Sequence, residues 1–173
     1  MGKNRRGKFC AFNGFRGNGD LMDRLVQVER TYDTALVRSI LSNKRLKMRI
    51  SDAPIEAFDP ASQENLYYLV CKRGETAIGI VVFHAFNSLA CCQGHVNYLP
   101  EYWGEDLHKY TTKAIEWIFE NTDFIKIVAL VPDYYAIVLK HALAAGMKKE
   151  GYLTNAVISN GKPDNMTLLG IEK

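Results

Sequence analysis

Residues 97–121, NYLPEYWGEDLHKYTTKAIEWIFEN, indicate the end of a strand, a loop with one glycine, and then an amphipathic helix. Positions after Gly104 recur at helical spacing and predict a buried stripe on one side of that helix: Leu107, Thr111, Ala114, Ile115 and Ile118. A helix that begins after a glycine loop presents unbonded N–H groups and the positive end of its dipole, which attract anions. Two acids, Glu105 and Asp106, stand where such an anion would lie.

The chain before this segment alternates between strand and helix patterns. Residues 25–33 alternate like a strand, and residues 33–43 indicate a helix. Residues 65–86 indicate two strands joined by a tight turn, and residues 88–100 a third strand. Gly94, inside the third strand, indicates a bulge or a close approach of another part of the chain.

The chain after this segment continues in the same way. Residues 124–132 are almost continuously apolar, as in a strand covered on both faces, and residues 133–146 indicate a helix that ends at a glycine. Residues 148–158 and 165–172 flank a hairpin turn. The resulting order, β-α-loop-β-β-β-α-β-α-β-β, predicts an α+β domain built on one mixed sheet.

Length and composition fit one globular domain. The chain has 173 residues and 47% hydrophobic content, and it has no apolar run long enough to cross a membrane. Its four cysteines form no C-x-x-C motif and its four histidines are scattered, so we expect reduced thiols, no metal site and a cytoplasmic protein.

The basic charge of the protein is concentrated at the N-terminus. Residues 1–19 contain no acid and five bases, whereas the whole chain has a net charge of only +3, so the remainder is slightly acidic. We therefore expect a basic arm rich in glycine and phenylalanine at residues 1–20 and a folded domain at residues 21–173. The arm is either a solvated terminus or a segment that meets nucleic acid, an acidic protein or an assembly surface.

Four stretches together resemble the GCN5-related N-acetyltransferase (GNAT) superfamily: LPEYWG, the VALVP strand, GMKKEGYL and NGKPDNMTLLGI. The resemblance runs from about residue 25 to residue 171. It is greatest to the subgroup that modifies protein N-termini and small amines, and it extends to acetyltransferase-like proteins encoded by bacteriophages. It implies one mixed, mostly antiparallel sheet, flanked by helices, in which two central strands splay apart.

The resemblance also implies a site for acetyl-coenzyme A. The cofactor would enter the gap between residues 90–99 and 124–131. Its pantetheine arm would pair with the backbone of three residues: Val96, Asn97 and Tyr98. Its pyrophosphate would rest at the start of the following helix, on seven residues: Trp103, Gly104, Glu105, Asp106, Leu107, His108 and Lys109.

Three positions depart from the family pattern. The family loop reads Gln/Arg-x-x-Gly-x-Gly/Ala, and here the second small residue is Asp106. Its carboxylate adds a charge beside a diphosphate, or it caps the helix and occupies the amides that a phosphate needs. At the start of the later helix, Tyr135 and Val138 stand where the family commonly has an asparagine and a serine.

Catalytic roles can be assigned to three side chains. Tyr134 and Tyr135 lie where these enzymes often keep a tyrosine that protonates the leaving thiolate. His95, on the splayed strand, is the candidate base because an imidazole titrates near neutral pH. For each of the three, a packing role in the core is the alternative.

Two functions follow. One is an acetyl-coenzyme A-dependent N-acetyltransferase that modifies a protein N-terminus, a lysine or a small amine. The other is a catalytically silent protein of the same fold that binds partners through its basic arm, such as a structural or assembly component of a phage, located in the host cytoplasm or the virion. The sequence leaves the acceptor and the oligomeric state open.

Overall fold

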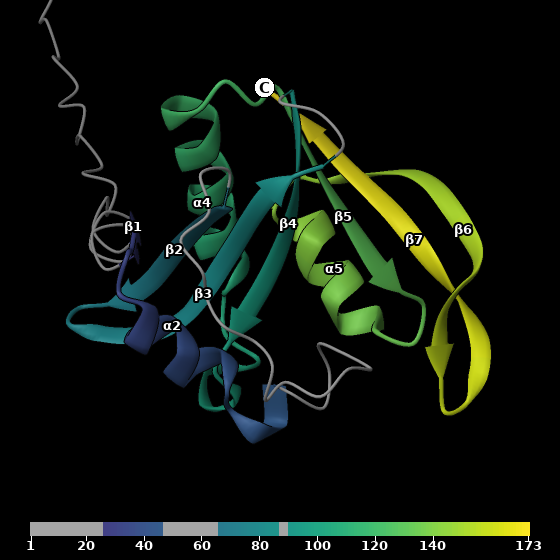
Figure 1. The fold of residues 1–173 in the computed structure, drawn as a ribbon, viewed down its shortest axis with the longest axis horizontal. Helices are drawn as coiled ribbons and strands as arrows, with labels where there is room; N and C mark the ends of the chain where they lie inside the picture. The colour runs from purple at the N-terminus through teal and green to yellow at the C-terminus, as the bar shows by residue number, and fades with distance from the viewer. Residues whose placement is uncertain (1–25, 47–65, 87–89) are drawn as a thin grey trace, which may run out of the picture.

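The computed structural model describes residues 26–46, 66–86 and 90–173, which form a seven-stranded sheet with helices on both faces (Figure 1). The strand order is β1-β2-β3-β4-β5-β7-β6. The elements in chain order are β1 (Val26–Arg30), α2 (Thr34–Leu41), β2 (Leu66–Arg73), β3 (Thr76–Ala85), β4 (Cys91–Tyr98), η2 (Pro100–Tyr102), α4 (His108–Asn121), β5 (Lys126–Pro132), α5 (Ala136–Ala144), β6 (Lys148–Ser159) and β7 (Lys162–Glu172).

The sheet is antiparallel except at its centre. β1 to β4 form a meander, and β5, β7 and β6 form a second antiparallel block. The two blocks meet where β4 pairs in parallel with β5, and the connection between these two strands runs through α4. This arrangement confirms the predicted mixed, mostly antiparallel sheet.

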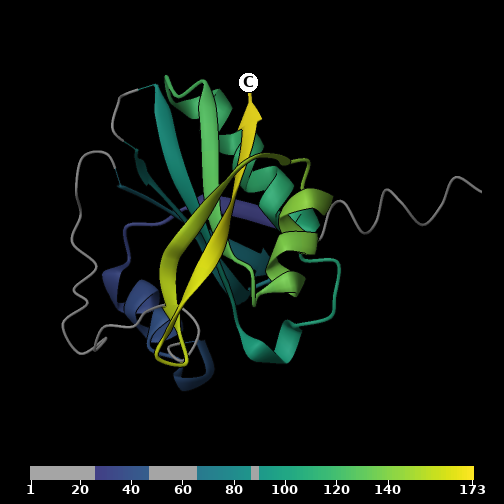
Figure 2. The same ribbon diagram turned by 90° about the vertical axis from the view of Figure 1, so that its right-hand side faces the viewer.

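Helices cover the two faces unequally (Figure 2). α2 packs on one face, where Val37 and Ile40 contact Tyr68, Val70 and Ile80 of the sheet in the smaller core. α4 and α5 pack on the other face, over a larger core that includes Leu69, Phe83 and Ile127, all buried. Alternate residues of β2 and β3 thus face different cores, which is why these two strands are apolar on both sides.

Local signals explain how the elements begin and end. The Asp33 carboxylate accepts a hydrogen bond from the Leu36 N–H at 2.9 Å and caps α2. α5 ends at Gly146, whose φ of 97° is in the left-handed region that a helix C-terminus favours. The β6–β7 hairpin turns through Asn160 and Gly161, both with positive φ, as a two-residue type I′ turn requires.

Two strand glycines make room for aromatic rings. A Cβ on Gly94 would lie 3.0 Å from the Phe83 ring, and β4 pairs with β3 through this position without a register shift. Of the two predicted reasons for Gly94, the close approach is therefore the correct one, and the bulge is absent. A Cβ on Gly79 would lie 2.5 Å from the Tyr98 ring and 2.7 Å from the Asn97 carbonyl oxygen. β3 and β4 can therefore pair at this position only because Gly79 has no Cβ.

The predicted order of elements agrees with the structure across the described residues. The helix at residues 33–43, the three-strand meander, the central crossover and the C-terminal hairpin all form. The proposed arm at residues 1–20 lies outside the described residues, so its role stays a prediction. No helix in the described part of the chain has the length and apolar character needed to cross a membrane.

Candidate functional site

The parallel strands β4 and β5 separate part-way along their length. They pair at Cys91–Lys126, Cys92–Ile127 and Gln93–Val128, and the pairing stops there. β4 continues to Tyr98 paired with β3, and β5 continues to Pro132 paired with β7. The predicted splay of the central strands is therefore present, and it opens toward the carboxyl ends of both strands.

Backbone groups of β4 face this opening at alternate residues. The Cys91 carbonyl accepts from the Phe86 N–H, and the Leu99 N–H donates to the Ile78 carbonyl, so the odd-numbered residues of β4 point their backbone groups toward β3. The alternation of a strand then turns the groups of Val96 and Tyr98 toward β5.

The three residues expected to hold pantetheine are thus not equivalent. The backbone of Asn97 pairs with Ile80 of β3 and is directed away from the opening. The carbonyl oxygen of Tyr98 accepts a hydrogen bond from the Trp103 indole N–H at 2.8 Å. The backbone of Val96, together with the N–H of Tyr98, therefore offers the polar groups that an extended ligand could pair with beyond Gln93.

Two helices begin at the open end of the splay. α4 follows β4 after a loop, and α5 follows β5 after a short turn, so both helix N-termini lie near the carboxyl ends of the parallel strands (Figure 1). Ligand sites in sheets with parallel strands commonly form at this position, because the strands diverge and the helix dipoles point at the same place.

The loop before α4 turns through a glycine and leaves the start of the helix without a side-chain cap. Gly104 has a φ of 96°, and a Cβ there would meet no atom within 4 Å, so the conformation rather than crowding calls for glycine. No side chain caps α4 at Leu107. Within the described part of the chain, the backbone N–H groups of Gly104, Asp106 and His108 donate to no protein acceptor. These groups can receive an anion.

The two acids of the loop are engaged with bases on its outer side. Glu105 forms an ion pair with Arg73 from the end of β2, and hydrogen bonding to that guanidinium lowers the pKa of the carboxylate. Asp106 pairs with Lys109 at 2.9 Å, and the same kind of contact lowers the pKa of Asp106. The possibility that Asp106 caps the helix is therefore wrong, because its carboxylate is held by a side chain one turn further on.

The tyrosines at the start of α5 differ in their surroundings. Their rings meet edge to face, with centroids 4.2 Å apart. Tyr135 is half-buried against the larger core, and its N–H donates to the Pro132 carbonyl. Tyr134 is 42% exposed. Tyr134 is thus the tyrosine that a ligand at the open end of the splay could reach more easily.

His95 lies on the face of the sheet opposite to α4 and α5. Its neighbours on the same side of the sheet, Ile80 and Val82 of β3, belong to the core beneath α2. Its ring stacks on His84, and the two Nε2 atoms are 3.1 Å apart. Desolvation by the surrounding protein, together with the adjacent His84, lowers the pKa of His95. His95 is therefore a neutral, partly exposed imidazole at the edge of the splay.

A buried chain of polar side chains lies between β4, α4 and α5, and sequence reasoning did not find it. The Tyr98 hydroxyl is 2.8 Å from Thr111 Oγ1, which is 2.7 Å from His141 Nε2, and the Cys71 thiol contacts the Tyr98 hydroxyl. Burial raises the pKa of Tyr98 and Cys71 and lowers that of His141 to about 4. The chain connects the end of the splayed strand to both helices whose starts form the site.

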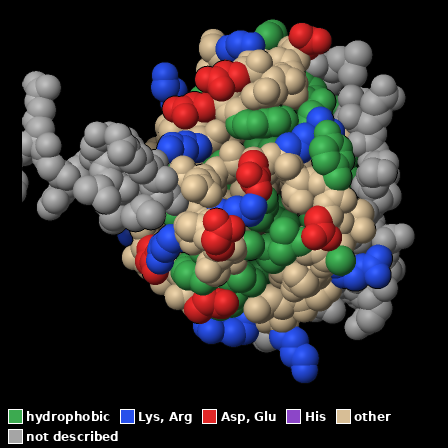
Figure 3. Space-filling view, turned by 90° about the vertical axis from the view of Figure 1, so that its left-hand side faces the viewer, with side chains coloured by type: hydrophobic (Ala, Val, Ile, Leu, Met, Phe, Trp, Pro, Cys, Tyr) green, Lys and Arg blue, Asp and Glu red, His purple; other side chains and the backbone are tan. Residues whose placement is uncertain are grey.

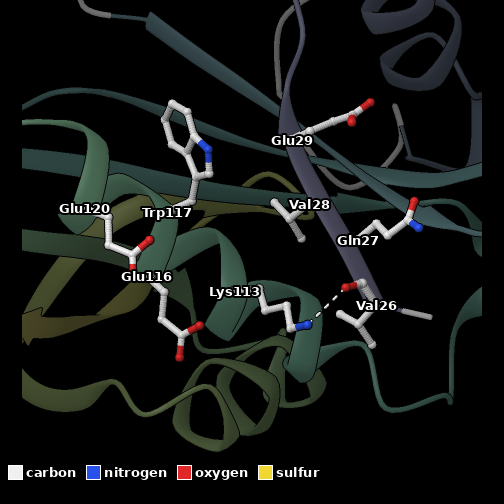
Figure 4. Close-up of a pocket in the computed structure, with 8 residues that line it drawn as sticks. All are labelled: Val26, Gln27, Val28, Glu29, Lys113, Glu116, Trp117 and Glu120. Atoms are coloured by element: carbon white, nitrogen blue, oxygen red, sulfur yellow. Dashed lines mark hydrogen bonds between the residues drawn. The ribbon is translucent and has the colours of Figure 1, made fainter. Parts of the chain in front are cut away.

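An open hollow on the described part of the surface lies elsewhere, between β1 and α4 (Figure 4). It has a volume of about 410 Å³ and is lined by Val26, Gln27, Val28, Glu29, Lys113, Glu116, Trp117 and Glu120. The Lys113 ammonium donates to the Val26 carbonyl across it. This side of the molecule carries acidic and basic side chains around an apolar area (Figure 3), and none of the predicted site residues lines the hollow.

Solved structures with the same fold include N-acetyltransferases. The spermidine N-acetyltransferase from Vibrio cholerae in complex with CoA and spermine superposes with a TM-score of 0.74 and 15% identity, over 86% of this chain and 96% of that one. An acetyltransferase of the GNAT family from Bacillus anthracis superposes with a TM-score of 0.55 and 14% identity, over 62% of this chain and 66% of that one. At this identity the likeness shows the fold.

The chain therefore has the GNAT acyl-CoA N-acyltransferase fold, as its sequence indicated. Residues 31–173 match the family described as "Protein of unknown function (DUF2824)", and the chain belongs to that family. No curated protein matches the sequence.

Proposed function

We propose that the protein is an N-acetyltransferase that uses acetyl-coenzyme A and transfers the acetyl group to a primary amine. The observation that carries this proposal is the end of the β4–β5 pairing after Gln93, which leaves the Val96 backbone facing an opening beside two helix N-termini. The solved enzyme from Vibrio cholerae, which has the same fold, is in complex with CoA and spermine, which supports both the cofactor and an amine acceptor.

Residues of the open end have distinct roles in this proposal. The Val96 backbone and the Tyr98 N–H pair with the pantetheine amides. The N–H groups of Gly104, Asp106 and His108 receive the pyrophosphate, and the helix dipole adds to their attraction. The Lys109 ammonium supplies a cation at the same helix start.

The chemical step requires a neutral amine, a hydrogen bond to the thioester carbonyl and a proton for the leaving thiolate. Tyr134 and Tyr135 are the candidate donors to the thiolate, and the exposure of Tyr134 favours it over Tyr135. His95 is the candidate group on the acceptor side. Its lowered pKa keeps the ring unprotonated at neutral pH, the form that accepts a proton, but also makes it a weak base.

The alternative is a silent GNAT-fold module that binds a partner through the arm at residues 1–19. Asp106 at the position of a small residue, and Tyr135 at the position of a small polar one, favour it, because each adds bulk where a cofactor would bind. Under this alternative the fold persists but acetyl-coenzyme A does not bind. Deleting residues 1–19 separates the two roles, since an arm that serves another partner leaves cofactor binding intact.

Thermal unfolding with and without acetyl-coenzyme A tests the proposal. A ligand present at a hundredfold excess over its dissociation constant stabilises the folded state by about 2.7 kcal/mol, which raises the melting temperature. Release of free thiol in the presence of spermidine or a lysine-containing peptide then tests transfer. The absence of any shift at millimolar acetyl-coenzyme A would favour the silent module.

A proline at position 96 makes the test specific to the splay. Val96→Pro removes the N–H that faces the opening and spares the bonds of β4 with β3, which come from the odd-numbered residues. We expect it to lose most of the acetyl-coenzyme A shift, whereas the control Val96→Ala, which keeps the N–H, retains it. The melting temperature of each variant without ligand checks that the fold survives.

A further inference from the structure

The imidazole rings of His84 and His95 meet through their Nε2 atoms. The residues lie on the adjacent antiparallel strands β3 and β4, on the face that carries α2. Their Nε2 atoms are 3.1 Å apart, and the ring planes are inclined by 14°. Two nitrogens so close must share either a proton or an ion, because two lone pairs facing each other would repel.

The backbone fixes the state of the His84 ring. Its Nδ1 atom lies 3.2 Å from the Ala85 carbonyl oxygen, which can only accept, so Nδ1 carries the hydrogen. In the neutral ring, Nε2 then presents a lone pair toward His95. Histidines that bind metals commonly donate the other ring N–H to a carbonyl or carboxylate in this way, which orients the ring before the ion arrives.

The separation of the two Nε2 atoms fits ligands of one ion. Imidazole nitrogens bind zinc at about 2.0–2.1 Å, which places two of them about 3.3–3.4 Å apart in a tetrahedron and about 2.9 Å apart at a right angle. The observed 3.1 Å lies between these values. We propose that His84 and His95 form a two-imidazole site for a late first-row divalent ion such as Zn²⁺, Ni²⁺ or Cu²⁺.

The surroundings allow an ion to reach the pair. His95 is exposed and His84 is half-buried, so the site is open to solvent on one side. No group of three or more His, Cys, Asp or Glu side chains suited to a metal occurs among the described residues. Water or a bound ligand would complete the coordination, and the ion would exchange readily.

The alternative is that His95 only donates a hydrogen bond to His84 and that the pair binds no metal. Calorimetric titration of the untagged protein with ZnCl₂ and with NiCl₂ distinguishes the two. We expect one ion bound per chain, a loss of about tenfold or more in affinity for His84→Ala and for His95→Ala, and little change for His108→Ala. His108 is a matched control because it is a histidine on α4, remote in sequence and outside the pair.

A second measurement keeps the test independent of folding. In ¹⁵N spectra of the histidine side chains, Zn²⁺ should move the Nε2 signals of His84 and His95 together and leave those of His108 and His141 in place. The melting temperature of each variant without metal checks the fold. The proposal is overturned if the wild type binds no ion at millimolar metal, or if both alanine variants bind as the wild type does.

Discussion

Asp106 and Lys109 form an ion pair across the first turn of α4, with 2.9 Å between Oδ2 and Nζ. The Asp106 side chain is 70% exposed, and it leaves the N–H groups at the helix start unoccupied. Asp106, which the sequence predicts to block the loop, is therefore held away from the helix start by Lys109. What remains is a charge near the site, partly balanced by Lys109 and screened by solvent.

Removing that charge should strengthen cofactor binding. Interactions between exposed charges are weak and screened by salt, so we expect Asp106→Asn to tighten acetyl-coenzyme A binding by a factor of up to about five. Calorimetry at low and high salt measures the effect, which should shrink as salt rises. Glu120→Gln makes the same change of charge at the far end of α4 and should have little effect. Weaker binding by Asp106→Asn would mean that the carboxylate itself contacts the ligand.

A methyl group at Gly79 should destabilise the protein. The added Cβ would lie within 3 Å of the Tyr98 ring and of the β4 backbone, so the splayed end of β4 must shift. Overpacking of this kind costs about 1–3 kcal/mol. Urea unfolding of Gly79→Ala measures the loss. Gly151→Ala is the control, because its Cβ would meet Leu168 at an ordinary 3.6 Å. Equal free energies of unfolding for the two variants would show that β4 can shift to accommodate the added methyl group without loss of stability.

The buried hydroxyl of Thr111 should matter more than that of its neighbour. Thr111→Val leaves both the Tyr98 hydroxyl and His141 Nε2 without this partner, and a buried polar group left unsatisfied costs about 1–3 kcal/mol. Thr112→Val removes only a bond to the His108 carbonyl on a half-buried side of the helix. Chemical denaturation of both variants tests the difference. Similar losses for the two would contradict a special role for the buried chain.

Stability should fall as the pH drops below the ordinary range of histidine. Burial, with a smaller contribution from His108, lowers the pKa of His141 from 6.5 to about 4. Above pH 6.5 the ring is neutral in both the folded and unfolded states, so it contributes no pH dependence. Between pH 6.5 and about 4 the unfolded chain binds a proton that the folded protein excludes, and stability is lost.

At pH 5 and above, the effect of His141 can be separated from that of the carboxylates, which bind protons mainly at lower pH. We expect a loss of about 1–2 kcal/mol between pH 7 and pH 5, which denaturation at each pH measures. The variant His141→Gln should show a smaller loss over the same interval, because the remaining dependence comes from other groups such as His95. An equal slope in wild type and variant would show that His141 does not titrate in this way.

The fold could be predicted because each local signal agreed with the global arrangement. Asp33, Gly146 and the Asn160–Gly161 turn mark the ends of elements by their own chemistry, and the apolar segment 124–132 places Phe124, Ile127 and Val131 in the larger core. The location of the splay followed from resemblance to a family rather than from any residue pattern within the two strands.

The details of the site depended on register, which sequence does not reveal. Whether Val96 or Asn97 faces the opening is decided by the pairing of β4 with β3, and so is the meeting of His84 with His95. The contact of Thr111 with His141 joins two helices that are distant in sequence. The pairing of Glu105 with Arg73 likewise required coordinates, because the two residues are 32 positions apart in the sequence, whereas Asp106 and Lys109 are three residues apart on one helix turn.

The brief contact between β4 and β5 has a mechanical consequence. In the described part of the sheet, three register pairs at one end of β4 and β5 join strands β1–β4 to strands β5, β7 and β6, so we expect the sheet to bend most easily along this short contact. A ligand bound between the separated ends of β4 and β5 would link the two strands where they form no hydrogen bonds with each other. Ligand binding in the opening should therefore reduce the motion of β6 at the edge of the sheet, although β6 does not contact the ligand.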